Sequence, residues 1–297
     1  MKTTALACLL GASLAAFGQT APQLVPVTSL SAAPKTDGEL GEWGNAGWVK
    51  LPVNPALDKS ERAKYGLDPK EDKNQTGSLV VQIKAGVFGD RLYIALRYPD
   101  NSEDSTARQW EWRGEKYVEG KQREDLLALR FALSGDFDRS MLSNKDYTVD
   151  VWLWSAARTN PSGVAEDMTH HVTTKMIESA AEYEAPGNQT IYIKKLRDTG
   201  NPPYKLLPKP RDYRGDKLPL FELGTSSAGA ADVAAKGRWR AGYWQLEFAR
   251  ALNTGHADDV AFKPGHKTLG QIAVFNQGYA EHKSVSEPFV LDLSGLK

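Results

Sequence analysis

Residues 79–98 read LVVQIKAGVFGDRLYIALRY, and this stretch decides the fold class of the chain. Two segments rich in β-branched, aromatic and other apolar residues flank the dipeptide Gly89-Asp90, which favours a turn. The pattern predicts a β-hairpin. No segment of the chain shows a comparably regular helical period. We therefore predict an all-β protein, an immunoglobulin-like β-sandwich with long loop excursions and a few short helices.

Further strands are expected on both sides of this hairpin. The C-terminal part carries an alternating apolar strand at 270–275 and another at 289–293, so the turn Glu281-His282-Lys283 between them is expected at one rim of the sandwich. The other predicted strands lie at 126–131, 148–154 and 238–250, the last being a hairpin that turns at Ala241-Gly242.

Long polar stretches separate these strands, at 58–77, 101–123 and 160–236. The last contains several prolines and a run of small residues, so we expect a loop-rich insertion there. Loops of this length are usually functional or disordered, and they are suited to cover a ligand pocket at one end of a sandwich. The length remaining after residue 18 suits a single domain, 19–297.

The N-terminus has the features of a secretory signal peptide. A lysine at position 2 precedes an apolar run that ends with small residues near Gly18, so we expect a Sec-type signal at 1–18 and a periplasmic or secreted protein. This run is shorter than the roughly 20 residues needed to span a bilayer, so we do not expect an integral membrane protein. A lipid anchor on Cys8 is disfavoured because only five residues would form its apolar segment.

Composition excludes several classes of site. Cys8 is the only cysteine, so a mature chain has no disulfide, thiolate nucleophile, cysteine-ligated zinc or covalently attached haem. Lysine and arginine together number 37, as do aspartate and glutamate, which gives no net field to attract nucleic acid. We also find no hydrolase motif, and scattered carboxylates do not identify a glycosidase pair. No catalytic residue is predicted, and we expect a binding or electron-transfer protein rather than an enzyme.

Several weak motifs, taken in order, resemble one family. They are DGELGEW at 37–43, VQIKA at 81–85 with LYIALRY at 92–98, EDLLALRF at 124–131, Met141 followed by DVWLWSAART at 150–159, GYWQLEFARAL at 242–252, and the closing strand pair around Lys283. Their order resembles the haem-binding domain of ethylbenzene dehydrogenase gamma subunits and of their relatives in dimethylsulfide dehydrogenase, chlorate reductase and selenate reductase.

The resemblance implies a β-sandwich that binds one non-covalent haem b per chain. By position, the axial ligands would be Met141 and Lys283. A thioether favours Fe(II), and two protein ligands leave no open coordination position for a substrate, so such a haem transfers electrons. The implied partners are periplasmic molybdenum oxidoreductase subunits and a soluble cytochrome. Here Leu142 stands where many relatives have glycine after the methionine, and the covalent haem motif of some relatives is absent.

Other assignments of these residues stay open. His282 competes with Lys283, because imidazole is a commoner iron ligand and adjacent positions point to opposite faces of a strand. Met141 could be an ordinary loop methionine, and Met168 and Met176 are the other methionines of the mature chain. The pair His170-His171 is interpreted as polar loop residues rather than a metal site, because adjacent histidines point apart.

A second function class is a carbohydrate-binding module on a similar sandwich. The opening pattern Asp-Gly-x-Leu-x-x-x-Trp occurs in such modules, and exposed indole rings stack on sugars. The tryptophans that would serve in this way are Trp110, Trp112, Trp239 and Trp244. Exposed aromatic residues lining a cleft would favour this class, and a cavity between Met141 and Lys283 would favour haem.

Overall fold

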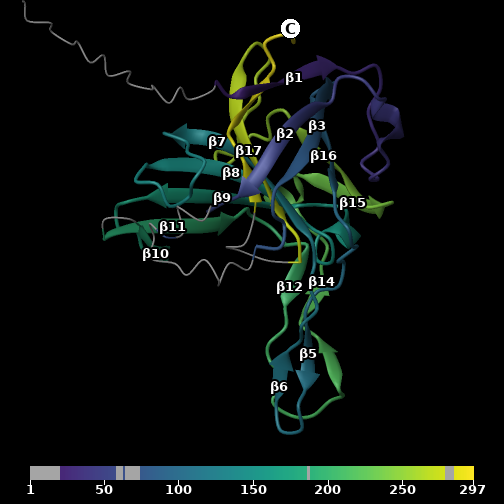
Figure 1. Ribbon diagram of the computed structural model, residues 1–297, viewed down its shortest axis with the longest axis vertical. Coiled ribbons are helices and arrows are strands. Elements are labelled where there is room, and N and C mark those ends of the chain that lie inside the picture. Colours follow the sequence, from purple (N-terminus) through teal and green to yellow (C-terminus); the bar gives the residue numbers. More distant parts are fainter. Residues whose placement is uncertain (1–20, 58–62, 64–73, 186–187, 278–283) are drawn as a thin grey trace, which may run out of the picture.

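The computed structural model describes residues 21–57, 63, 74–185, 188–277 and 284–297. Nearly all regular structure in these residues is β, and most strands belong to one 14-stranded sheet that folds over to form a sandwich (Figure 1). This confirms the predicted fold class. The strands of the large sheet are β1 (Gln23–Ser29), β2 (Val49–Pro55), β3 (Leu79–Phe88), β4 (Arg91–Pro99), β7 (Leu126–Gly135), β8 (Tyr147–Ser155), β9 (Glu166–Thr173), β10 (Ala181–Ala185), β11 (Gln189–Arg197), β15 (Ala234–Arg240), β16 (Tyr243–Ala251), β17 (Lys267–Phe275), β18 (Ser284–Ser286) and β19 (Phe289–Asp292).

The order of the strands divides the sheet into two layers. One layer runs β10-β11-β9-β8-β7-β17, the other runs β2-β3-β4-β16-β15, and β18 joins them by pairing with both β17 and β2. The first strand, β1, adds a parallel connection because it pairs with β19 and with β3. The two layers are therefore continuous along one edge.

The main core lies between the layers and is dominated by aromatic side chains. Trp154 of β8 packs edge-on against Trp244 of β16, with 4.9 Å between ring centroids, and Trp152 stacks on Phe248 at 6.3 Å. All four rings are almost completely buried. Aromatic pairs of this kind contribute roughly 0.5–1.5 kcal/mol beyond the area they bury. They fix the spacing of β8 and β16, which come from opposite layers.

The two predicted hairpins are confirmed. β3 and β4 meet at the expected Gly89-Asp90 turn, and β15 and β16 meet at Ala241-Gly242, where both residues have positive φ values of 51° and 83°. The helical segments with more than one described residue are 3-10 turns, η1 (Leu40–Trp43), η3 (Asn160–Ser162) and η4 (Ala228–Ala231). No helix among the described residues is long and apolar enough to cross a membrane.

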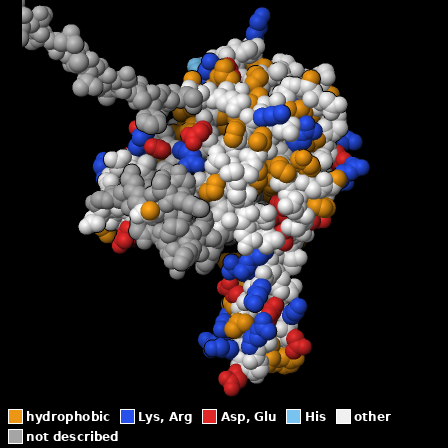
Figure 2. Space-filling view, in the orientation of Figure 1, with side chains coloured by type: hydrophobic (Ala, Val, Ile, Leu, Met, Phe, Trp, Pro, Cys, Tyr) orange, Lys and Arg blue, Asp and Glu red, His pale blue; other side chains and the backbone are white. Residues whose placement is uncertain are grey.

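A narrow arm projects from the sandwich. It contains the sheet of β5 (Gln109–Trp112), β6 (Tyr117–Glu119) and β13 (Lys217–Pro219), and the pair β12 (Tyr204–Leu206) and β14 (Phe221–Leu223) lies between it and the body (Figure 1). Basic and acidic side chains are interspersed over its surface (Figure 2). The stretches 101–123 and 160–236, expected to be loops, thus contain strands as well.

The sequence did not reveal β9 within the stretch 160–236, because this strand is buried on both faces. β9 reads EDMTHHVT, and seven of its eight residues are buried although most are polar. Its neighbours are β8 on one side and β11 on the other. A polar sequence that is fully covered lacks the alternation by which a half-exposed strand is recognised.

Candidate functional site

The layer β11-β9-β8-β7-β17 has a second apolar face, directed away from the main core. Alternation along each strand produces it: on β8, Trp152 and Trp154 enter the main core, whereas Val149 and Val151 lie on the opposite face. We call this surface the outer apolar face. Its buried members include Leu126, Val149, Val151, Leu153, Met168, Val172, Ile191, Ile193 and Phe275.

Met141 lies against this face. It belongs to the loop between β7 and β8, is half-buried, and packs on the cluster of the outer apolar face. The loop is folded back by Arg130, whose guanidinium donates hydrogen bonds to the carbonyl oxygens of Asp138 at 2.6 Å and Arg139 at 2.9 Å. The hydroxyl of Tyr147 donates to the carbonyl oxygen of Ser140 at 3.2 Å. Hydrogen bonds from Arg130 of β7 and Tyr147 of β8 to the three residues before Met141 therefore fix its position.

The other predicted ligands, Lys283 and His282, lie outside the described residues. The strands that flank them are described. β17 ends at Phe275, which belongs to the same apolar cluster that Met141 contacts. β18 begins at Ser284, whose side chain is buried and whose Oγ donates to the carbonyl oxygen of Gly77 at 2.5 Å.

Arg139 links the methionine loop to the strand that begins after Lys283. Its guanidinium donates to the carbonyl oxygens of Pro55 at 3.1 Å and Ala56 at 3.3 Å, and Pro55 is paired with Ser284 across β2 and β18. It also forms an ion pair with Glu287 at 2.9 Å. Arg139, two residues before Met141, is thus hydrogen-bonded to Pro55. Pro55 in turn pairs with Ser284, the residue that follows Lys283.

Gln271 of β17 makes a second link between the same two segments. Its amide Nε2 donates to the carbonyl oxygen of Arg139 at 3.2 Å and to that of Ser286 at 2.8 Å. Its Oε1 accepts a 2.5 Å hydrogen bond from Arg130. Because Gln271 and Arg130 are both buried, these bonds are protected from water and hold the loop and β18 in a defined relation.

The residues around Met141 fit a haem in chemical type. A thioether beside an apolar cluster offers a soft ligand in a water-poor environment. A different hollow, of about 550 Å³, opens beside Gln277, the last described residue before the Lys283 segment. Its lining includes Asp104, Lys121 and Arg123, so it is polar and charged, and it suits an apolar macrocycle less well.

A histidine that the sequence interpretation set aside also lies on the outer apolar face. His170 is on β9, between Met168 and Val172, and is buried, whereas His171 points the other way and is half-exposed. The two histidines do point apart, as expected, but they occupy a strand and not a loop. His170 stands opposite Val149 in the sheet register, so its imidazole lies on this face as well.

The motifs that carry the family resemblance mostly build the sandwich. Trp43 of the opening motif donates from its indole nitrogen to Glu247 of β16 at 2.7 Å, and the backbone N–H of Gly38 donates to the same carboxylate at 2.9 Å. Burial raises the pKa of Glu247 although these bonds favour its charged form. Asp150 and Arg250, from two other motifs, form a fully buried ion pair at 2.6 Å. These residues are structural.

The tryptophans proposed for sugar stacking are mostly unavailable. Trp244 is buried in the main core, so that assignment is wrong, and its indole nitrogen donates to Asp125 at 2.9 Å. Trp239 is half-buried against the same core and donates to the carbonyl oxygen of Asp100. Trp110 and Trp112 lie half-buried on β5 of the arm, where Trp112 packs edge-on against Tyr213.

Comparison with known proteins identifies similar chains. In fold, the chain is similar to a protein of Bacteroides uniformis described as carbohydrate-binding, with a TM-score of 0.38 and 8% sequence identity over 92% of this chain and 91% of that one. It is also similar to a family 9 carbohydrate-binding module of Caldicellulosiruptor kristjanssonii, solved with glucose, with a TM-score of 0.33 and 11% identity over 92% and 88% of the two chains. No curated protein matches the chain.

A protein-family model gives the decisive match. The model described as ethylbenzene dehydrogenase matches residues 41–286, which is most of the chain and runs from η1 to the end of β18. The match includes the methionine loop, the outer apolar face and the segment that contains Lys283. The chain therefore belongs to the ethylbenzene dehydrogenase family.

Proposed function

We propose that this chain is an exported haem protein that passes single electrons between a molybdenum oxidoreductase and a soluble carrier such as a cytochrome. The observation that carries the proposal is the double link through Arg139 and Gln271. It joins the loop that holds Met141 to the strand that starts after Lys283. Membership of the ethylbenzene dehydrogenase family supports the same proposal.

The proposed ligands are Met141 and Lys283, with His282 as the alternative to the lysine. Bound between two such side chains, haem b supplies a one-electron couple without an open coordination position. The chain's own part is to hold the thioether against an apolar surface and to deliver the amine in its neutral form. A free lysine has a pKa near 10.4, so burial and the charge of the iron must both favour loss of its proton.

The proposed location is the periplasm. Residues 1–18 have the composition of a signal peptide, and the chain without them has no cysteine, so the haem would be held without a covalent bond. The electron-transfer partners would dock at the surface near the bound haem, because single-electron transfer requires close approach. A catalytic subunit is the proposed partner on one side, and a small soluble carrier on the other.

The test is the visible spectrum of the mature protein reconstituted with haem, oxidised and then reduced with dithionite. We expect a low-spin spectrum that is lost in Met141→Ala and Lys283→Ala and retained in His282→Ala. Met176→Ala is the matched control for the methionine, since Met176 is 78% exposed, and Lys263→Ala is an exposed lysine control. Both controls should leave the spectrum unchanged.

Three results would refute or change this proposal. Absence of haem absorbance after reconstitution would refute it and would make sugar-binding screens the next step. Loss of the spectrum in His282→Ala with retention in Lys283→Ala would keep the function and transfer the ligand role to the histidine. Retention of the low-spin spectrum in Met141→Ala would remove the methionine from the ligand set.

A further inference from the structure

A cluster of aspartates lies at the edge of the main core, away from Met141. We call it the acidic cluster, and it comes from five separate parts of the chain: β8, β9, the residue after β11, the residue after η4, and the loop that follows β16. Four of the five side chains are buried, and that of Asp232 is half-buried. Its members are Asp150, Asp167, Asp198, Asp232 and Asp259.

Among the described residues, one arginine and one histidine contact the cluster, fewer than its carboxyl groups. Arg250 is completely buried and pairs with Asp150 at 2.6 Å and with Asp259 at 3.3 Å. His256 is 41% exposed, and its Nδ1 lies 2.9 Å from Asp232 and 3.7 Å from Asp259. One guanidinium and one rim imidazole thus face five carboxyl groups. Buried carboxylates are normally paired with cations or bound to a metal.

Asp167 is the member whose environment is least complete. Its side chain is 3% exposed, and neither of its carboxylate oxygens accepts a hydrogen bond from a described residue. The Oδ2 atom of Asp198 is likewise buried without such a bond. Asp150 differs, because its Oδ2 accepts from Arg250 and from the backbone N–H of Val260. Buried polar atoms without partners are rare in proteins and indicate a missing ion or water.

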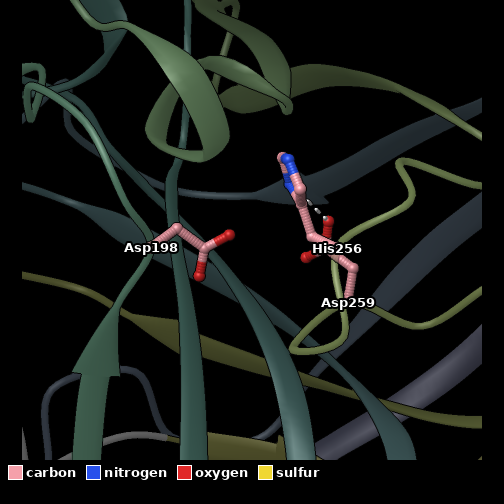
Figure 3. A group of neighbouring side chains, drawn as sticks. All are labelled: Asp198, His256 and Asp259. Carbon is pink, nitrogen blue, oxygen red and sulfur yellow. Dashed lines mark ion pairs between the residues drawn. The ribbon is translucent and has the colours of Figure 1, made fainter.

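The spacing of the carboxylates suits a single ion. Ligand atoms of Asp198, His256 and Asp259 lie within 4.8 Å of one another (Figure 3). The ligand atoms of Asp150, Asp167 and Asp259 are equally close to one another. Asp259 belongs to both groups. A calcium ion binds oxygens at about 2.3–2.6 Å, so two oxygens on opposite sides of the ion are roughly 5 Å apart. Each group is compact enough to hold one ion, and the second group consists of carboxylates alone.

The backbone holds Asp167 and Asp198 together. The N–H of Asp198 donates to the carbonyl oxygen of Asp167 at 3.2 Å, just beyond the end of β11. Both residues line a small cleft, with Glu166, Arg197, Gly200 and Pro202 among the other lining residues. The cleft places the carboxyl groups of Asp167 and Asp198 near the protein surface. In Figure 3, Asp198 extends from a strand end toward the loop that carries His256 and Asp259.

The proton affinity of the cluster agrees with this geometry. Burial first, and then the charges of Asp150 and Asp259, raises the pKa of Asp167 to about 10. Burial and neighbouring carboxylates, Asp258 foremost, raise the pKa of Asp198 to about 7. Both shifts show that these carboxyl groups lack compensating positive charge in the folded protein.

We propose that the acidic cluster binds one divalent cation that prefers oxygen ligands, with Asp150, Asp167 and Asp259 as its protein ligands and Ca²⁺ as the representative ion. Asp150 keeps its Oδ2 atom on Arg250 and offers Oδ1, and Asp198 and His256 lie at the rim. The dominance of carboxylates over imidazole favours such a hard cation over zinc. The ion would join β8 and β9 to the loop after β16, and therefore one layer of the sandwich to the other. This site is independent of the proposed haem site.

The test is thermal unfolding of the full mature chain after treatment with a chelator, followed by titration with Ca²⁺, Mg²⁺ or Zn²⁺. We expect Ca²⁺ at about 100 times its dissociation constant to raise the unfolding midpoint by roughly 5–10 °C, with saturation. Asp167→Asn and Asp259→Asn should reduce this increase by at least half. Asp212→Asn, at an exposed position of the arm, is the matched control and should respond like the unaltered protein.

Each outcome bears on the proposal directly. An unaltered protein whose midpoint does not respond to Ca²⁺ would overturn it, and so would a response to Zn²⁺ alone. If Ca²⁺ raised the unfolding midpoint of Asp167→Asn as much as that of the unaltered protein, Asp167 would not be a ligand. If a variant does not fold, terbium luminescence of the unaltered protein still decides the matter. Trp152 lies 4.7 Å from the guanidinium carbon of Arg250, so bound Tb³⁺ should be sensitised by tryptophan excitation and displaced by Ca²⁺.

Discussion

Replacing Glu247 by glutamine tests how the opening motif is attached to the sandwich. The Glu247 carboxylate is 2% exposed and accepts three hydrogen bonds, from the indole nitrogen of Trp43 at 2.7 Å, from the N–H of Gly38 at 2.9 Å and from that of Asp37 at 3.1 Å. Glutamine has the same shape but keeps one acceptor oxygen. Its NH₂ group must face at least one buried N–H donor.

The magnitude follows from these contacts. Hydrogen bonds to a charged group contribute roughly 1.5–3 kcal/mol each, and a buried unsatisfied donor costs about 1–3 kcal/mol. We expect Glu247→Gln to lower the free energy of unfolding by about 2–4 kcal/mol. Trp43→Phe removes one of the donors and part of the ring, and should cost about 2–3 kcal/mol. Since the two residues share a bond, the double variant should lose about 1–2 kcal/mol less than the sum.

The assay is urea unfolding followed by far-UV circular dichroism, because the loss of Trp43 alters the fluorescence signal. Glu115→Gln, at an exposed position of the arm, controls for the loss of one negative charge. A Glu247→Gln protein within 0.5 kcal/mol of the unaltered one would refute the reasoning. Strict additivity in the double variant would show that the bond between Trp43 and Glu247 contributes nothing.

Three further predictions concern other parts of the molecule. Burial raises the pKa of Asp125 from 3.8 to about 7, so the folded state retains a proton that the unfolded state releases, and the free energy of unfolding should fall as pH rises from about 4 to 7. In Asp125→Asn, this part of the pH dependence should disappear from urea unfolding measured across the same range. A β-carbon on Gly237 would lie 2.5 Å from the Trp154 ring, so Gly237→Ala should destabilise by about 1–3 kcal/mol, whereas Gly41→Ala, which meets nothing within 4 Å, should cost less than 1 kcal/mol in the same assay. Arg139→Gln should lower the affinity for haem, measured by titration of the Soret band, about tenfold or more, and an unchanged affinity would contradict the link between the methionine loop and β18.

The sequence is informative where structure is local. The hairpin at 79–98 was predictable because its strands pair with each other through a short turn, and the same holds for β15 and β16. β18 was not foreseen, since three residues that read Ser-Val-Ser carry no periodic signal. β9 was missed because its acidic and histidine side chains are buried by partners that the local sequence does not reveal.

The sequence indicated one of the two candidate sites and not the other. Met141 was singled out from the family resemblance, and the structure places it on an apolar face, whereas Lys283 and His282 lie outside the described residues and stay predictions. The acidic cluster could not be anticipated. Its members stand at positions 150, 167, 198, 232 and 259, and only the folding of both layers brings them together. No spacing along the chain distinguishes them from surface aspartates.

The position of β1 constrains the order in which the molecule can be completed. Gln23 pairs in parallel with Phe289, so the first strand of the described chain and the last belong to one ladder, and β1 also bonds to β3. β19 is made after every other strand of the described chain, so this ladder cannot close before those strands have been synthesised. A nascent chain with its N-terminus engaged elsewhere would therefore remain incomplete along this edge. Topology alone delays the closure of this edge until β19 has been made.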